Sequence, residues 1–225
     1  MKLLLCVSSL SDIDAALREL SFPTQPHSSL SFLHSTKILH HEIDILETGV
    51  GVVQTTYKLT KALSLQKYHL ALKLSFGNAY KEETSVGSVL NIINEKPGDY
   101  GRMVNEEWKD HYDLGLMKRE DEPQVRGGFV NLTNAYMNIF SPFKKSVGIT
   151  VNNYADVNSL ALRKEKYKAD CETGDGLGFT YTCLFEKQSF YHLCFVERNL
   201  ATTEEAIETA KKAMNETLID LIRKL

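Results

Sequence analysis

Short apolar runs alternate along this chain with longer stretches whose apolar positions recur every three or four residues. The short runs predict buried strands, and the three-to-four-residue period predicts helices with one buried face. We expect strands at 3–7, 34–46 (one strand or a hairpin), 70–74, 86–93, 147–151 and 190–196, and helices at 12–20, 52–65, 157–168, 177–186 and 203–225. This alternation predicts one α/β domain over residues 1–225. It should have three layers, with helices flanking a central mixed, mostly parallel sheet.

Helix boundaries and buried faces can also be proposed from the pattern. Ser11 or Asp12 is the expected cap of helix 12–20, and Thr202 or Thr203 that of helix 203–225. Helix 52–65 opens after Gly49-Val50-Gly51. Its apolar side is expected to hold Val53, Tyr57, Leu59 and Leu63.

Two segments depart from the strand–helix pattern. Residues 75–79 (Ser-Phe-Gly-Asn-Ala) are expected to form a turn after strand 70–74. Residues 94–138 are polar and rich in charge, and we expect a long excursion with little regular structure. Five apolar or aromatic residues stand near its end, and they either form a contact surface or anchor the excursion to the core: Tyr136, Met137, Ile139, Phe140 and Phe143.

Composition narrows the class of protein. The 225 residues are 43% hydrophobic with a net charge of −3, which gives no electrostatic reason to expect a nucleic-acid or membrane partner. The run at residues 1–7 is too short for a signal peptide and has no cleavage site after it. The four cysteines show neither a CxxC pair nor a histidine at ligand spacing. We therefore expect reduced thiols, a cytoplasmic location, no metal site and no cofactor.

Candidate chemistry lies where predicted strands run into loops, because ligands of such sheets bind beyond the carboxyl ends of the strands. Polar or small residues follow five strands, at 8–12, 75–79, 152–154, 172–178 and 197–199. The most informative loop holds Gly174-Asp175-Gly176 just before a buried helix. An Asp at this position can accept hydrogen bonds from the hydroxyls of a sugar, or it can simply cap the helix. No Ser-His-Asp, P-loop or GxGxxG pattern is present in the sequence.

Several segments resemble, in order and spacing, the purine nucleoside phosphorylase/nucleosidase superfamily, and most nearly its futalosine hydrolases. They are an acidic residue at Asp12 after the first strand, Thr48-Gly49-Val50-Gly51 opening a helix, 72–79 at the glycine-rich loop, 86–90, Gly148-Ile149-Thr150-Val151-Asn152, and 172–183. Three motifs differ from the family pattern. Its Met-Glu is Gly174-Asp175 here, its Gly-x-Ala-Gly loop is 75–78, and its Arg-x-Ile-Ser-Asp/Asn segment is 194–199.

The resemblance implies an N-glycosidic hydrolase that cleaves the N-ribosidic bond of futalosine or a related purine nucleoside, an activity of a menaquinone route. Asp12 would activate water, and Asp175 with Gly174 would hold the ribose. Glu197, in protonated form, or Asn199 would neutralise the leaving base at N7. Contacts to the base or its loop would come from Phe76, Gly77, Asn78, Asn152 and Tyr154. A homo-oligomer is also implied. The alternative is a non-catalytic relative that binds a nucleoside or only assembles.

Overall fold

The computed structural model describes residues 1–22, 25–26, 29–38, 40–153, 157–199 and 206–225. Within them, ten strands form one mixed sheet in the order β11-β10-β6-β12-β5-β1-β4-β3-β2, with β9 paired to β6. The inner strands β12, β5, β1 and β4 run parallel. In chain order the strands are β1 (Lys2–Val7), β2 (Gln25–Pro26), β3 (Leu33–Ile38), β4 (His41–Glu47), β5 (Leu70–Ala79), β6 (Val89–Pro97), β9 (Phe129–Val130), β10 (Lys144–Thr150), β11 (Cys171–Thr173) and β12 (Phe190–Arg198).

One half of the sheet closes on itself. Strand β11 pairs in parallel with β10 and antiparallel with the end of β5, so β5, β12, β6, β10 and β11 form a ring. Cys171 pairs with Ala79 and Glu172 with Asn78 at the closure. Closing the ring removes two open sheet edges and packs the last residues of β5 between two neighbours.

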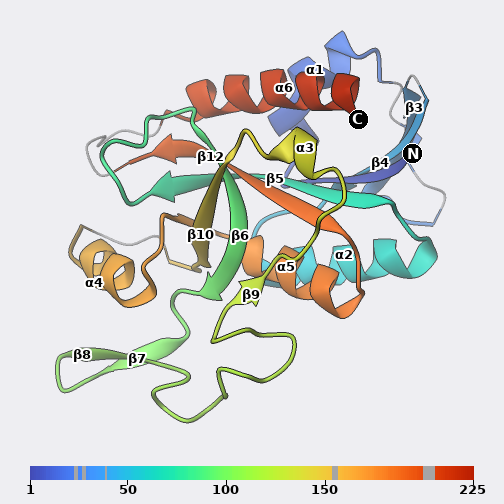
Figure 1. Cartoon of the computed structure of the whole chain (residues 1–225). Coiled ribbons are helices and arrows are strands. Elements are labelled where there is room, and N and C mark those ends of the chain that lie inside the picture. Colours follow the sequence, from blue (N-terminus) through green and yellow to red (C-terminus); the bar gives the residue numbers. More distant parts are fainter. Residues whose placement is uncertain (23–24, 27–28, 39, 154–156, 200–205) are drawn as a thin grey trace.

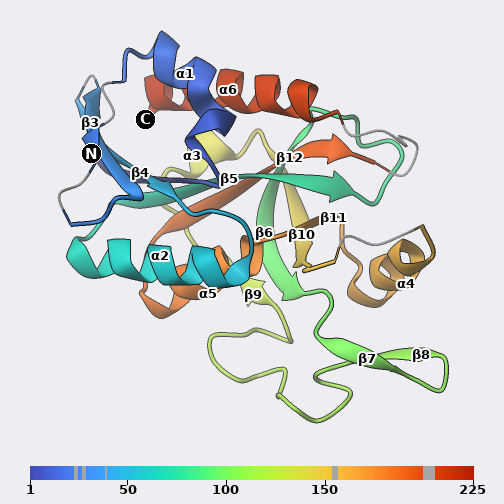
Figure 2. The same ribbon diagram turned by 180° about the vertical axis from the view of Figure 1, so that it is seen from behind.

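Helices cover both faces of the sheet. In Figure 1, α6 and α1 lie above it with the short α3, whereas α2 and α5 lie below, and the reverse view agrees (Figure 2). The helices are the 3-10 turn η1 (Leu10–Ile13), α1 (Asp14–Glu19), α2 (Val52–Leu65), α3 (Met137–Phe140), α4 (Val157–Tyr167), α5 (Gly176–Phe185) and α6 (Ile207–Lys224). The predicted three-layer α/β class is confirmed. No helix in the described ranges combines the length and apolar character needed to cross a membrane.

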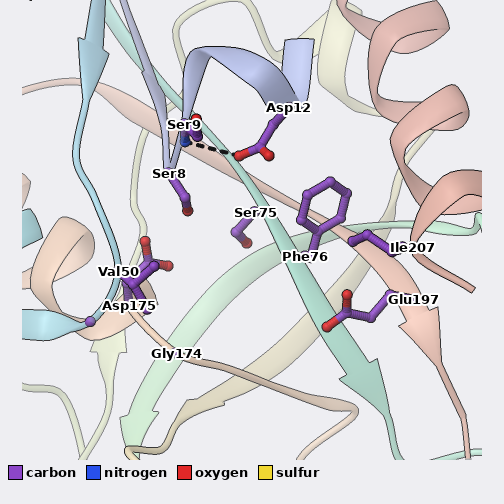
Figure 3. A pocket seen from close by; sticks show the side chains of 11 residues that line it. Ser8, Ser9, Asp12, Val50, Ser75, Phe76, Gly174, Asp175, Glu197 and Ile207 are labelled. Atoms are coloured by element: carbon purple, nitrogen blue, oxygen red, sulfur yellow. Dashed lines mark hydrogen bonds between the residues drawn. The ribbon is translucent and has the colours of Figure 1, made fainter. Parts of the chain in front are cut away.

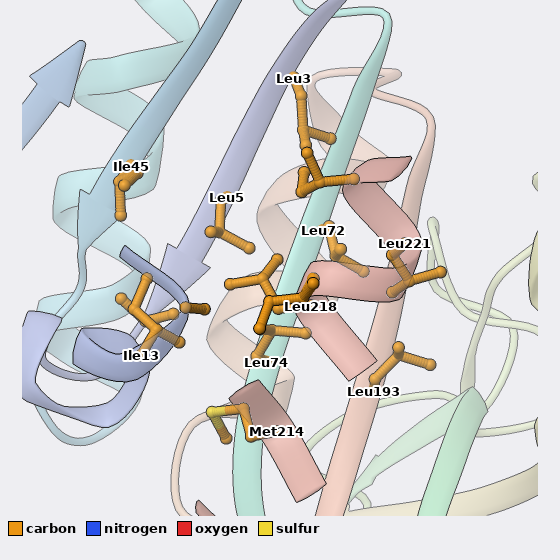
Figure 4. Packing of buried hydrophobic residues seen from close by; sticks show 14 of the residues in the cluster. Leu3, Leu5, Ile13, Ile45, Leu72, Leu74, Leu193, Met214, Leu218 and Leu221 are labelled. Carbon is orange, nitrogen blue, oxygen red and sulfur yellow. The ribbon is translucent and has the colours of Figure 1, made fainter. Parts of the chain in front are cut away.

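The continuous apolar run of β1 reflects burial on both faces. Successive side chains of a strand point to opposite sides. Leu3 and Leu5 pack beneath α6 with residues such as Leu218, as Figure 4 shows, while Leu4 and Cys6 join the cluster on the opposite face, between the sheet and α2 and α5. A strand covered on both faces carries no polar alternation, which is why the run stands out in the sequence.

Two helix details were predicted wrongly. The first helical segment starts as η1, and its N-cap is Ser9 rather than Ser11 or Asp12. Asp12 is the N3 residue of the helix, and its side chain completes a capping box with Ser9. Helix α2 spans the predicted residues, but Val53 and Tyr57 are exposed, at 82% and 59%. The prediction is confirmed for Leu59 and Leu63, and Thr55 and Ala62 complete the inward face. The Thr202/Thr203 cap lies outside the described residues.

The expected turn at 75–79 is wrong, because these residues complete β5. Ser75 and Phe76 pair with Cys194 and Phe195 of β12. A Cβ on Gly77 would lie only 2.6 Å from the carbonyl oxygen of Glu172, so this glycine permits close strand packing and makes no turn.

The excursion at 94–138 holds more structure than expected. It contains the end of β6, the hairpin β7 (Gly101–Val104) and β8 (Glu107–Asp110), and β9. Near its end, Phe140 is buried and stacks on Tyr191 with ring centroids 3.8 Å apart. Tyr136, Ile139 and Phe143 also pack against the core, whereas Met137 is half exposed. The anchoring alternative therefore describes this cluster.

Candidate functional site

A cavity of about 330 Å³ opens at the carboxyl ends of the inner strands (Figure 3). This is the edge at which ligands of open α/β sheets bind. The lining comes from both ends and the middle of the chain: Ser8, Ser9, Asp12, Val50, Gly51, Ser75, Phe76, Gly174, Asp175, Glu197 and Ile207. Of the ten predicted site residues, the structure brings Asp12, Phe76, Gly174, Asp175 and Glu197 together here.

Asp12 is held in place by the capping box that begins η1. Its Oδ2 accepts a hydrogen bond of 2.9 Å from the backbone N–H of Ser9, drawn as the dashed line in Figure 3. Partial burial raises the pKa of the Asp12 carboxyl, and the Ser9 N–H opposes part of that rise. Oδ1 accepts no hydrogen bond from the part of the chain that the structure describes. A ligand or water in the cavity therefore meets a carboxylate with one committed and one available oxygen.

Asp175 occupies the N-cap position of α5, but its side chain makes no capping hydrogen bond. Its Oδ2 lies instead 2.5 Å from Nζ of Lys73, a fully buried lysine on β5, and 3.4 Å from Oγ1 of Thr55. Lys73 also donates to Oγ1 of Thr48 over 3.3 Å. The capping alternative for Asp175 is wrong. The residue is half of a buried ion pair whose carboxylate borders the cavity.

Sequence reasoning missed Lys73, although a signal was present. The lysine interrupts the apolar run Leu70-Ala71-Leu72-Lys73-Leu74. A lysine is almost never fully buried unless a partner neutralises it. Its position in a predicted buried strand therefore required an acidic partner elsewhere in the chain.

The cavity has an apolar wall as well as an acidic one. Phe76 of β5 and Ile207 at the start of α6 line one side, and Figure 3 shows them beside Glu197. Phe76 also packs against the core beneath α6, so the core supports its ring. A ligand with one flat apolar part and one part rich in hydroxyls matches these two walls.

Four predicted site residues lie elsewhere. Gly77 is packed between β11 and β12, and Asn78 is buried with Nδ2 donating to Glu172 Oε1 over 3.3 Å. Asn152 is exposed and bonds Asp99 through its backbone N–H and side chain. The amide of Asn199 donates to the carbonyls of Glu82 (3.3 Å) and Thr84 (2.8 Å). The extension of β5 through Ala79 explains the first two, since it makes them sheet residues. Tyr154 lies outside the described residues.

No protein-family model and no curated protein sequence matches the chain. Solved structures match its fold along almost its whole length. The S-adenosylhomocysteine nucleosidase of Streptococcus pyogenes, in complex with 5-methylthiotubericidin, has a TM-score of 0.81 at 14% identity, covering 100% of this chain and 97% of that one. The 5′-methylthioadenosine/S-adenosylhomocysteine nucleosidase of Campylobacter jejuni has a TM-score of 0.80 at 15% identity, covering 100% of both chains. The chain has the nucleosidase fold.

A futalosine hydrolase mutant of Helicobacter pylori also shares the nucleosidase fold, with a TM-score of 0.79 at 13% identity and 100% coverage of both chains. The three scores are nearly equal, so the fold does not favour futalosine hydrolase over the other nucleosidases as the nearest relative. These likenesses show the fold, and the cavity lies at the carboxyl ends of its inner strands.

Proposed function

We propose that this protein hydrolyses the N-ribosidic bond of a small purine nucleoside. The observation that supports this most is the meeting of Asp12 and Asp175 at one cavity within a nucleosidase fold. The two carboxylates come from distant parts of the chain, and the cavity of about 330 Å³ suits one small ligand.

In the proposed reaction, Asp12 acts as general base. Its carboxylate takes a proton from water while the water oxygen bonds to C1′ and the C1′–N bond breaks. The bonding electrons leave with the purine, which takes up a proton, and Glu197 on the same cavity is the candidate donor. Positive charge grows on the sugar in the transition state, and the acidic wall stabilises it.

Asp175 is proposed to hold the ribose. Lys73 and Thr55 occupy its Oδ2, so Oδ1 is the oxygen that would accept from a sugar hydroxyl. The Lys73–Asp175 pair is neutral as a whole, so the carboxylate of Asp12 gives the cavity wall a negative charge. An acidic cavity disfavours an anionic co-substrate, which supports hydrolysis over phosphorolysis.

Futalosine and related 6-oxopurine nucleosides are the proposed substrates, on the strength of the sequence resemblance. A cytoplasmic role in menaquinone synthesis would follow from that choice. The apolar wall of Phe76 and Ile207 would face the base, and the acidic wall would face the sugar.

One observation favours a second candidate, nucleoside binding without hydrolysis. The Lys73 ammonium group lies 2.5 Å from Asp175, which weakens the ability of that carboxylate to stabilise a cationic sugar. A protein that kept the cavity and lost the chemistry would bind nucleoside with no release of base.

The test is to incubate the protein with futalosine, inosine and methylthioadenosine and to measure free base by chromatography. Asp12→Asn should lower kcat at least about a hundredfold and leave Kd nearly unchanged, because an amide accepts no proton from water. Asp14→Asn, at an exposed neighbour paired with Arg18, is the matched control and should turn over like wild type. Binding without release from any nucleoside selects the second candidate. Neither binding nor release would refute both.

A further inference from the structure

Beneath the cavity lies a buried serine–histidine–glutamate arrangement. Oγ of Ser75 on β5 is 2.7 Å from Nε2 of His192 on β12. Nδ1 of the same imidazole is 3.6 Å from Oε2 of Glu95 on β6. The side chains come from three adjacent strands, and each residue is at most 3% exposed.

The Glu95 and His192 side chains face each other at a separation longer than a hydrogen bond. Thr150 Oγ1 donates to Oε1 of Glu95 over 2.7 Å and fixes that carboxylate. Oε2 of Glu95 and Nδ1 of His192 face each other, and neither has a hydrogen-bond partner within the described ranges. Their separation is about 0.7 Å beyond an ordinary N–H···O bond, and such bonds are often long before a substrate binds. Unsatisfied buried polar atoms are rare enough to require an explanation.

Gly176 shows that the backbone is shaped around this pair. A Cβ at Gly176 would lie 2.7 Å from Oε2 of Glu95 and 2.8 Å from Cε1 of His192. Only a glycine therefore lets the start of α5 cover the pair. Packing against Glu95 and His192, and not contact with a ligand, therefore explains the glycine at position 176.

The serine end of the arrangement reaches the cavity. Ser75 belongs to the lining, and the pairing of β5 with β1 ends at Lys73, two residues before it. Figure 3 shows Ser8 and Ser75 pointing into the same space. Oγ of Ser9 accepts from both N and Oγ of Ser11, so its own proton remains to be donated. Two serine hydroxyls thus border the space beside Ser75.

We propose that Ser75 is a nucleophile, activated by His192 and oriented through Glu95, that hydrolyses a small uncharged carboxylic ester in this cavity. Nδ1 faces a carboxylate and carries the imidazole proton, which leaves Nε2 to accept from Ser75. The Ser8 and Ser9 hydroxyls are the donors available to an oxyanion. The Asp12 carboxylate on the cavity wall disfavours an anionic acyl group, and the cavity volume limits the ester to a small one.

The reaction runs in two steps. Ser75 Oγ bonds to the carbonyl carbon, its proton moves to Nε2, and the π electrons move to the carbonyl oxygen. As the carbonyl re-forms, the ester C–O bond breaks and the alcohol leaves with the proton from Nε2. Water then adds to the acyl-serine and gives its proton to Nε2. The acid leaves when the acyl–Oγ bond breaks, and Ser75 regains a proton.

The experiment uses the full chain with a fluorophosphonate probe and with p-nitrophenyl butyrate, in the absence of nucleoside. Peptide mapping by mass spectrometry should place one adduct on Ser75. Ser75→Ala should abolish the adduct and the ester turnover. Glu95→Gln should slow labelling at least about tenfold, because an amide no longer fixes the imidazole tautomer. Ser146→Ala, at a buried serine that donates to a backbone carbonyl, is the matched control and should label like wild type.

Three outcomes would overturn the proposal. They are a folded wild type without an adduct on Ser75, a Ser75→Ala variant labelled as fast as wild type, and a Glu95→Gln variant with an unchanged rate. Circular dichroism establishes that each variant is folded. Because no nucleoside is present, this test is separate from that of the proposed N-ribosyl hydrolysis, and either activity can fail alone.

Discussion

Removing the buried ammonium of Lys73 should lower the unfolding free energy of this protein by a large part. Lys73→Met keeps the length and apolar stem of the side chain but leaves the Asp175 carboxylate without its cation. At 2.5 Å and an effective dielectric constant of about 20, the gross attraction between the two charges is about 6–7 kcal/mol. Desolvation of both groups offsets most of it, so the pair adds little net stability over an apolar pair. Breaking one side is different, and should cost about 3–5 kcal/mol.

A double-mutant cycle isolates this effect. Lys73→Met and Asp175→Asn should each destabilise strongly, and the double variant should recover at least about 2 kcal/mol of the summed loss. The assay is urea unfolding followed by far-UV circular dichroism and by the fluorescence of Trp108, the single tryptophan. Unfolding free energies of domains are about 5–15 kcal/mol, so the predicted loss is well resolved.

A surface pair provides the control. Lys212 and Glu216 are 3.9 Å apart with both side chains more than half exposed. Lys212→Met should change the unfolding free energy by less than about 0.5 kcal/mol. Additive losses in the Lys73–Asp175 cycle, or a Lys73→Met loss as small as that of Lys212→Met, would refute the role of the ion pair.

Three further predictions concern the site, the packing and the thiols. Burial raises the pKa of Asp12 above its ordinary value of 3.8, so kcat/KM should decrease with falling pH along a limb centred above pH 3.8. Protonation of Asp12 should also stabilise the folded state as the pH falls through that range. A limb centred at or below pH 3.8 contradicts this prediction. Gly178→Ala should lower the unfolding free energy measured in urea by about 1–3 kcal/mol, although alanine favours helices. The reason is that the added Cβ would lie 2.8 Å from the carbonyl oxygen of Val52. A stabilised variant would show that α2 and α5 pack less closely. Burial raises the pKa of the Cys6 thiol to about 12 and the other three cysteines are also buried, so Ellman's reagent should find no reactive thiol until the protein unfolds; rapid reaction of the folded protein would contradict it.

The pattern predicted the layers well because burial on two faces leaves a strong signal. The runs that became β1, β10 and β12, and the segments that became α2, α4 and α5, were placed within a few residues. Strand β11 was missed because it is only three residues long, and its pairing with β5 is a tertiary event. Pairing with β12, and with β11 at Asn78 and Ala79, likewise makes 75–79 a strand and not the expected turn, against the local preference of Gly77 and Asn78.

The site was harder to predict because its residues interact across strands. Loops at strand ends identified Asp12, Asp175 and Glu197 as cavity residues. The partner of Asp175 is 102 residues away, and the distance in sequence between Ser75 and His192 is 117 residues. No spacing rule connects such residues, so the sequence carries no recognisable serine–histidine–acid pattern. Register between β5 and β12 decides the Ser75–His192 contact, and the start of α5 brings Asp175 to Lys73.

The position of β12 has a consequence for the synthesis of the chain. This strand is the last of the sheet to be made, yet it lies between β5 and β6 and pairs with both. Until residues 190–198 have left the ribosome, β5 and β6 lack their shared neighbour, and their edges and apolar faces stay open to other chains. The ring and the cavity are therefore completed late in translation. A ribosome that stalls before β12 would release an aggregation-prone fragment rather than a smaller working protein.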